Sequence, residues 1–251
     1  MNRKKFNRHL FIAICLCLIP LPGTVSAAEY AVASAHPLAT KAGIEILANG
    51  GNAFDAAIAV TSTLSVVEPY SSGIGGGGFY LLHQQKQNRQ VMLDARERAP
   101  LKATRDFYLD ANGEVDHDRS MNGATSAGIP GIPAALEHLQ NNYGRLTLTQ
   151  TLSSAIGYAQ NGFEVDEKYR RFAKFRLPVM QRFESSRQTL LRDGEIPALD
   201  SVLKQPDLAR TLRVIASAGA DGFYQGKVAQ QLVNSVQANG GVTPGVSVTK
   251  K

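Results

Sequence analysis

Residues 50–79 read GGNAFDAAIAVTSTLSVVEPYSSGIGGGGF, and the apolar first half of this stretch indicates the centre of the core. From Ala53 to Val67 nearly every residue is small or apolar, without the polar stripe of a surface helix. Asn52 can cap such a helix, and Asp55 lies three residues further on, near the positive end of the helix dipole. Because a helix that is apolar on every side is a buried one, we predict a core helix over residues 53–67.

The glycine run that follows, Gly73 to Gly78, formally contains a G-x-G-x-x-G motif. A dinucleotide site needs a strand before this motif and a helix after it, so that the pyrophosphate meets a helix N-terminus. Here the predicted helix precedes the glycines and a strand-like segment follows, and no Lys-Ser/Thr pair completes a P-loop. The pattern therefore favours a steric role, in which the glycines let another segment or a ligand lie against the backbone.

Outward from this stretch, apolar segments alternate with turns and connectors. Strands are predicted at residues 31–34, 79–83 and 90–93, and helices at residues 38–48, 134–143, 148–160, 207–218 and 227–238. The stretch 164–192, crowded with Lys, Arg and Glu, is typical of a solvated helical face. Together these patterns predict an α+β or layered α/β fold rather than a doubly wound sheet.

The first 27 residues have the pattern of a secretory signal peptide. A basic start leads into an apolar run from Leu10 to Ile19, and Val25-Ser26-Ala27 offers the small residues that a signal peptidase reads. The run is too short for a membrane span, although an uncleaved anchor is the alternative. Both cysteines, Cys15 and Cys17, lie in this segment, so the rest of the chain has no thiol for a disulfide, a nucleophile or a metal.

Charge and composition limit the partners of the remaining chain. The segment holds four of the 27 basic residues and none of the 21 acidic ones, which leaves a net charge of +2 for the rest. Such a balance gives no reason to expect a nucleic-acid partner. We expect an exported protein, most simply periplasmic, that binds neither nucleic acid nor membrane once the signal is removed.

Arg96 lies in the sequence Asp94-Ala95-Arg96-Glu97-Arg98-Ala99-Pro100, just past a predicted strand. An arginine at a strand end can present its planar fork of donors to a carboxylate, and Glu97 could orient it. An isolated Arg-Glu pair is more often an ordinary surface salt bridge. The residues alone therefore leave both interpretations open.

Four histidines lie outside the first 27 residues: His36, His83, His117 and His138. They are scattered, and no two have the H-x-x-x-H spacing of a metal site. No G-x-S-x-G nucleophile elbow is present. The sequence predicts neither a metal site nor a bound cofactor.

Taken together, these segments resemble the γ-glutamyltranspeptidase (glutathione hydrolase) family. The matching segments are His36 to Thr40, Gly50 to Ala57, Glu68 to Phe79, Asp94 to Pro100, Arg105-Asp106, Gly128 to Gly131, Asn161 to Phe163, Asp221 to Tyr224 and Gly240-Gly241. The resemblance runs from about Val32 to Gly241, and the order and spacing of its motifs make it specific.

The resemblance implies an N-terminal-nucleophile hydrolase with a four-layer αββα sandwich, cut from a precursor into a large and a small subunit. It also implies that a threonine at the start of the small subunit attacks the γ-glutamyl amide of substrates such as glutathione, and that the acyl group passes to water or to an amino acid. In this family the arginine of a D-x-R-E-x-A-P motif holds the α-carboxylate of the glutamyl group. The resemblance therefore implies that Arg96 binds the α-carboxylate of the glutamyl group and that Glu97 supports the Arg96 side chain.

The family's nucleophile lies beyond position 251, so the resemblance assigns no catalytic residue to this chain. It covers a large-subunit-like region, residues 28–241, and residues 242–251 diverge from the family's usual continuation. The leading expectation is a truncated large subunit that is inactive alone. Two alternatives stay open: a large subunit completed by a separately encoded small subunit, and a non-catalytic exported binder of glutamyl compounds.

Overall fold

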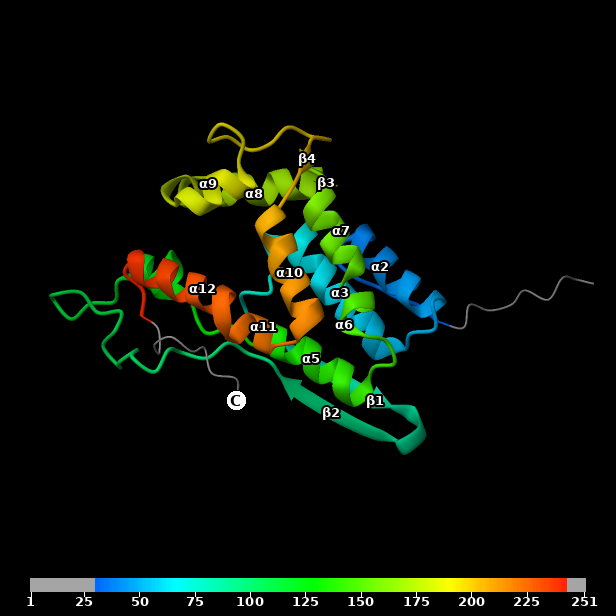
Figure 1. The fold of residues 1–251 in the computed structure, drawn as a ribbon. Helices are drawn as coiled ribbons and strands as arrows, with labels where there is room; N and C mark the ends of the chain where they lie inside the picture. Colours follow the sequence, from blue (N-terminus) through cyan, green and yellow to red (C-terminus); the bar gives the residue numbers. More distant parts are fainter. Residues whose placement is uncertain (1–29, 243–251) are drawn as a thin grey trace, which may run out of the picture. The chain divides into compact units, whose positions relative to one another are not determined.

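The computed structural model describes residues 30–242 of a chain that divides into two units, residues 1–31 and 32–251. Of the first unit only Tyr30 and Ala31 are described, and neither is in a helix or strand. The predicted signal peptide, residues 1–27, and the predicted tail beyond Val242 lie outside the described residues. All helices and strands below belong to the second unit (Figure 1).

Most of the second unit is helical. The α-helices are α2 (Pro37–Ala48), α3 (Ala53–Val67), α4 (His117–Met121), α5 (Ile132–Tyr143), α6 (Leu148–Thr151), α7 (Ser153–Asn161), α8 (Glu167–Arg182), α9 (Glu184–Leu190), α10 (Pro206–Ala218), α11 (Asp221–Tyr224) and α12 (Gly226–Ala238). The strands are β1 (Phe79–Gln84), β2 (Arg89–Asp94), β3 (Phe163–Glu164) and β4 (Val202–Leu203), and two short 3-10 turns are η1 (Gln85–Gln87) and η2 (Ala124–Ser126).

Helix α3 is the predicted core helix, and it packs against α2, α5 and α7. Asn52 Oδ1 accepts hydrogen bonds from the N–H groups of Phe54 and Asp55 at 2.8 and 3.1 Å, and Asp55 Oδ2 accepts from Asn52 N at 2.8 Å. This reciprocal capping box satisfies the first free donors of the helix. Several of its apolar side chains, such as Ile58 and Val66, are fully buried, and Val60 and Leu64 are partly buried, which confirms that the helix lies in the core.

The predicted strand at residues 31–34 is wrong. Residues 32–34 have no regular secondary structure, because no described strand lies beside them to complete a ladder. Val32 packs instead over Gly43 of α2, where an added Cβ would come within 2.9 Å of Val32 Cγ1. The apolar pattern identified a packed segment but assigned it the wrong structure.

The β1–β2 hairpin is amphipathic. Its strands are antiparallel with Phe79 opposite Asp94 and Leu81 opposite Met92, so these pairs share one face. On the other face Leu82 is buried against the helices. The first face leaves three large apolar side chains exposed to water: Phe79 (62%), Leu81 (69%) and Met92 (61%).

The second sheet is a short antiparallel pairing of β3 with β4. The described residues therefore form a mixed α/β fold that is mostly helical, with two-stranded sheets, so no layered sandwich is complete within them. The single helix predicted at 148–160 is two helices, α6 and α7, which meet at Leu152 (φ −90°, ψ −3°).

Helix α8 is more than the solvated face predicted for residues 164–192. Its Lys168 ammonium pairs with the carboxylate of Glu68, which is 2% exposed at the end of α3, and also donates to the carbonyl of Ala35 at 3.1 Å. Ser71 Oγ donates to the second oxygen of Glu68 at 2.8 Å. A buried carboxylate is tolerated only when it is paired and hydrogen-bonded, so this pair ties α8 to the C-terminal end of α3.

His36 lies beside this pair and caps α2 with its Nδ1, which accepts from Leu38 N at 3.1 Å. Burial lowers the pKa of His36 below its usual 6.5, although Asp166 and Glu68 oppose the shift and Lys168 adds to it. The folded state therefore holds the neutral ring, while the unfolded state takes up a proton near pH 6.5. Stability that depends on His36 is present above that pH and is lost as the pH falls through it.

We expect His36→Asn to make the dependence of stability on pH shallower between pH 7.5 and 5.5. Asparagine is a favoured N-cap and does not titrate, so the cap persists without the protonation cost. Urea unfolding followed by circular dichroism at several pH values measures the slope. His83→Asn, on the exposed face of the hairpin, is the control, and equal slopes for His36→Asn and the unaltered chain would contradict this account.

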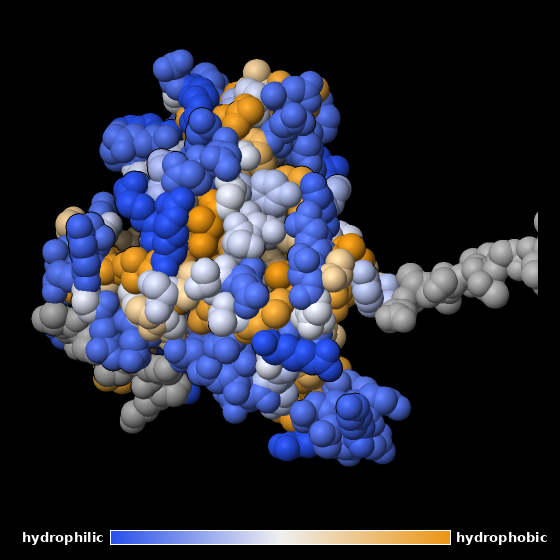
Figure 2. Space-filling model, turned by 45° about the vertical axis from the view of Figure 1, so that its right-hand side comes forward, coloured by the Kyte–Doolittle hydropathy of each residue, from blue (hydrophilic) through white to orange (hydrophobic). Residues whose placement is uncertain are grey.

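The face in Figure 2 mixes hydrophilic and hydrophobic residues without one continuous apolar area. Within residues 30–242, no helix has both the length and the hydropathy needed to span a membrane.

Candidate functional site

Three segments far apart in the sequence meet just beyond the hairpin. The segment 95–98 continues β2, and Ala95 exchanges two backbone hydrogen bonds with Gly78, at 2.9 and 3.1 Å. On its other edge Arg98 exchanges two with Ile129, at 3.0 and 2.8 Å. Gly131 N donates to Gly76 O at 2.9 Å and joins the two outer segments. Residues 95–98 are thus held on both sides by backbone hydrogen bonds.

Glycines allow this close packing. A Cβ at Gly77 would overlap the backbone N and the carboxylate of Glu97 and lie 2.6 Å from Arg96 Cα. A Cβ at Gly131 would overlap the carbonyl of Ala95, and one at Gly128 would lie 2.8 Å from Glu97 Cγ. Within the run, the predicted steric role is confirmed at Gly77, and the segment that lies against it is the one that carries Arg96; an added Cβ at Gly75 or Gly76 would meet nothing within 4 Å. Helix α3 precedes the glycines and β1 follows, as predicted, which is the reverse of a dinucleotide site.

Arg96 is half-exposed and held by local partners. Its backbone N donates to Asp94 Oδ1 at 2.9 Å, and its Nη2 lies 2.7 Å from Glu97 Oε1. The Arg96 side chain is 55% exposed and that of Glu97 is 32% exposed. Glu97 Oε2 is buried against Gly77 without a hydrogen-bond partner. An arginine has five N–H donors in a rigid fork, so one contact with Glu97 leaves most of them available to a ligand carboxylate.

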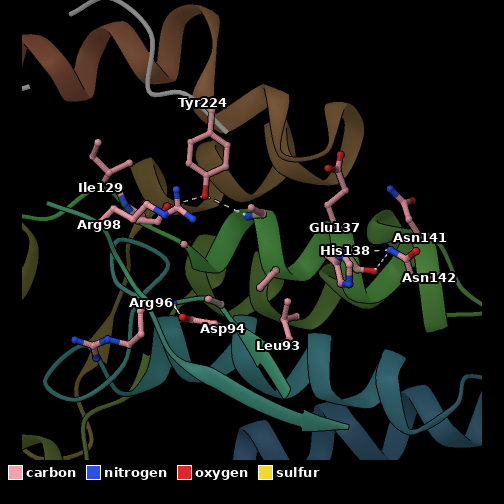
Figure 3. Close-up of a pocket in the computed structure, with 15 residues that line it drawn as sticks. Leu93, Asp94, Arg96, Arg98, Ile129, Glu137, His138, Asn141, Asn142 and Tyr224 are labelled. Atoms are coloured by element: carbon pink, nitrogen blue, oxygen red, sulfur yellow. Dashed lines mark hydrogen bonds between the residues drawn. The ribbon is translucent and has the colours of Figure 1, made fainter. Parts of the chain in front are cut away.

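A hollow of about 370 Å³ adjoins the segment. Its lining combines apolar residues, such as Leu93 and Ile129, with the polar and charged residues Asp94, Arg96, Arg98, Glu137, His138 and Tyr224. Figure 3 shows the Arg96 guanidinium directed away from His138 and Asn142. Arg96 is therefore neither buried nor closed off, and its predicted role as a carboxylate ligand stays a prediction.

The sequence interpretation missed Tyr224 as part of this site. Its phenol donates to Pro130 O at 2.7 Å and accepts from Ala134 N at 3.3 Å, so it fixes the turn that leads into α5. Burial raises its pKa to about 12, so it remains a neutral hydroxyl. The segment Asp221 to Tyr224 is one of the segments that match the family, and this match was the only sign in the sequence that Tyr224 could belong to the site.

The histidines do not converge on this site. His36 is buried at the start of α2, His83 lies on the hairpin, His117 begins α4, and only His138 lines the hollow. Across residues 30–242, no three His, Cys, Asp or Glu side chains are grouped so that they could hold a metal ion.

Comparison with known proteins gives one consistent match. A family model described as gamma-glutamyltranspeptidase matches residues 39–244. The glutathione hydrolase proenzyme of Pseudomonas sp. (strain A14) is 39% identical, with 96% of this chain aligned to 43% of that protein. The chain thus spans less than half the length of this curated relative.

Solved structures agree. The γ-glutamyltranspeptidase of Helicobacter pylori superposes with a TM-score of 0.86 at 36% identity, over 89% of this chain and 64% of that one. The γ-glutamyltranspeptidase of Pseudomonas nitroreducens complexed with L-DON superposes with a TM-score of 0.80 at 36% identity, over 87% of this chain and 63% of that one.

Proposed function

Because this chain belongs to the gamma-glutamyltranspeptidase family, we propose that it supplies the carboxylate-binding part of an enzyme that cleaves γ-glutamyl amides such as glutathione. Arg96 binds the α-carboxylate of the glutamyl group, and Glu97 holds the guanidinium in place. The observation that carries this proposal is the half-exposed guanidinium on a backbone segment fixed from both sides. Such preorganisation lowers the ordering cost of binding.

We further propose that catalysis needs a second segment that carries the threonine nucleophile and completes the αββα sandwich. The β1–β2 hairpin supports this, because the helices among residues 30–242 cover only one of its faces. Phe79, Leu81 and Met92 leave the other face apolar and exposed, which is typical of a surface that packs against another sheet. Export to the periplasm is part of the same proposal.

We expect Arg96→Gln to weaken binding of L-glutamine, which has the α-carboxylate and the γ-amide of the substrate, by about tenfold. A charge-assisted hydrogen bond contributes about 1.5–3 kcal/mol, and about 1.4 kcal/mol corresponds to a factor of ten. NMR titration of the isotopically labelled 251-residue chain with millimolar L-glutamine measures the dissociation constant.

Arg89→Gln is the matched control. Arg89 begins β2 and is exposed, so this change removes the same charge from the other end of the same strand. Its affinity should equal that of the unaltered chain. Identical affinities of the Arg96 and Arg89 variants would refute the assignment of the carboxylate to Arg96.

A further inference from the structure

Arg98 is a second guanidinium at the same site, and the proposed function does not use it. Exposure alternates along this segment: Asp94, Arg96 and Arg98 are exposed, whereas Ala95 is buried and Glu97 is partly buried. Alternation of this kind places Arg96 and Arg98 on one side of an extended chain. Their Cα atoms are then about 6.6 Å apart.

The backbone of Arg98 is fixed while its side chain is unengaged. Two hydrogen bonds with Ile129 hold its N–H and carbonyl. Its guanidinium has no hydrogen bond or ion pair with any residue that the structure describes, unlike that of Arg96, which pairs with Glu97. In the close-up the two side chains diverge, and Arg98 lies on the side of Tyr224 (Figure 3).

Two carboxylates also line the hollow, Asp94 and Glu137, and both already accept backbone hydrogen bonds. Asp94 Oδ1 accepts from Arg96 N at 2.9 Å, and Glu137 Oε1 accepts from Ala220 N at 3.1 Å. Neither forms an ion pair with Arg98. The Arg98 guanidinium therefore lies unpaired among the described residues, beside the proposed glutamyl site. The planar arrangement of its N–H donors suits a carboxylate.

We propose that Arg98 binds a second carboxylate, on the amine side of the scissile γ-glutamyl amide, and so favours substrates whose leaving group is an anionic amino acid or peptide. This inference rests on the proposed function, because Arg96 must hold the glutamyl carboxylate first. In an extended γ-glutamyl dipeptide the two carboxylates are further apart than the Cα atoms of Arg96 and Arg98. The diverging side chains of the two arginines therefore match such a ligand.

The test compares γ-glutamylglycine with γ-glutamylglycinamide, which differ only in the second carboxylate. NMR titration of the full 251-residue chain should give a dissociation constant about fivefold lower for the acid than for the amide, since an exposed ion pair contributes up to about 1 kcal/mol. Arg98→Gln should raise the constant for the acid to that for the amide. Arg98→Lys, which keeps the charge but loses the planar fork, should retain part of the preference.

The outcomes separate this inference from the proposed function. Equal affinity of the unaltered chain for acid and amide, or a preference that survives in Arg98→Gln, overturns the role of Arg98 and leaves that of Arg96 intact. Unchanged binding of both ligands by Arg96→Gln overturns the proposed function and the Arg98 inference with it. Backbone amide spectra of each variant show whether the fold persists.

Discussion

Asp55→Ala is expected to lower the free energy of unfolding by about 3 kcal/mol. The Asp55 carboxylate is fully buried and accepts from three backbone N–H groups: Asn52 at 2.8 Å, Arg145 at 3.0 and 3.1 Å, and Leu146 at 3.2 Å. It thus joins the start of α3 to a turn 90 residues away. Alanine removes all these acceptors, and each unsatisfied buried donor costs about 1–3 kcal/mol. Urea unfolding followed by circular dichroism measures the loss.

Asp110→Ala is the matched control for Asp55. The Asp110 carboxylate also accepts from backbone N–H groups, of Asn112 at 2.8 Å and Glu114 at 3.0 Å, but it is exposed. Water can replace an exposed acceptor, so little change in stability is expected. Similar losses for the two variants would mean that the number of hydrogen bonds, rather than their burial, determines the cost.

Asp55 also shows how far the sequence could predict the fold. Its position three residues after Asn52 predicted the helix cap, because capping is a local pattern. Its contacts with Arg145 and Leu146 have no local signature, so they were not predicted. The same holds for Glu68 and Lys168, which are 100 residues apart. Composition and periodicity predicted where α3 and the hairpin lie, while the partners that join them depend on tertiary structure.

The error at residues 31–34 has a related cause. A short apolar run is typical of a buried strand, but a strand exists only where another strand pairs with it. Val32 packs on Gly43 of α2 instead. The sequence shows that such a segment is apolar, but it does not show which element packs against it.

The candidate site, too, could be predicted from the sequence only in part. Arg96 and Glu97 became candidates because their motif resembles that of a known family, since an isolated Arg-Glu pair has no distinctive pattern. The steric interpretation of the glycine run holds at Gly77. However, neither Gly128 and Gly131 nor the segment 95–98 could be identified as its neighbours, because glycine has no side chain whose pattern points to a partner.

Gly77→Ala is the second large effect that we expect, with a loss of stability of about 2 kcal/mol or more. The added methyl would overlap the backbone N and carboxylate of Glu97 and press on Arg96 Cα at 2.6 Å. Gly77 has no positive φ, so the cost is steric rather than conformational. Overpacking of this kind typically costs about 1–3 kcal/mol, and here the obstructing atoms are mostly backbone and cannot rotate away. Urea unfolding measures this cost.

Gly76→Ala separates this steric effect from a general sensitivity of the glycine run. An added Cβ at Gly76 meets nothing within 4 Å, and Gly76 also has no positive φ, so its stability should match that of the unaltered chain. Because the clash at Gly77 displaces the segment that carries Arg96, Gly77→Ala should also weaken binding of L-glutamine, whereas Gly76→Ala should not. If Gly77→Ala folds with unchanged stability, the contact between Gly77 and Glu97 is not as close as described. The glycines would then be needed for a reason other than the placement of Arg96.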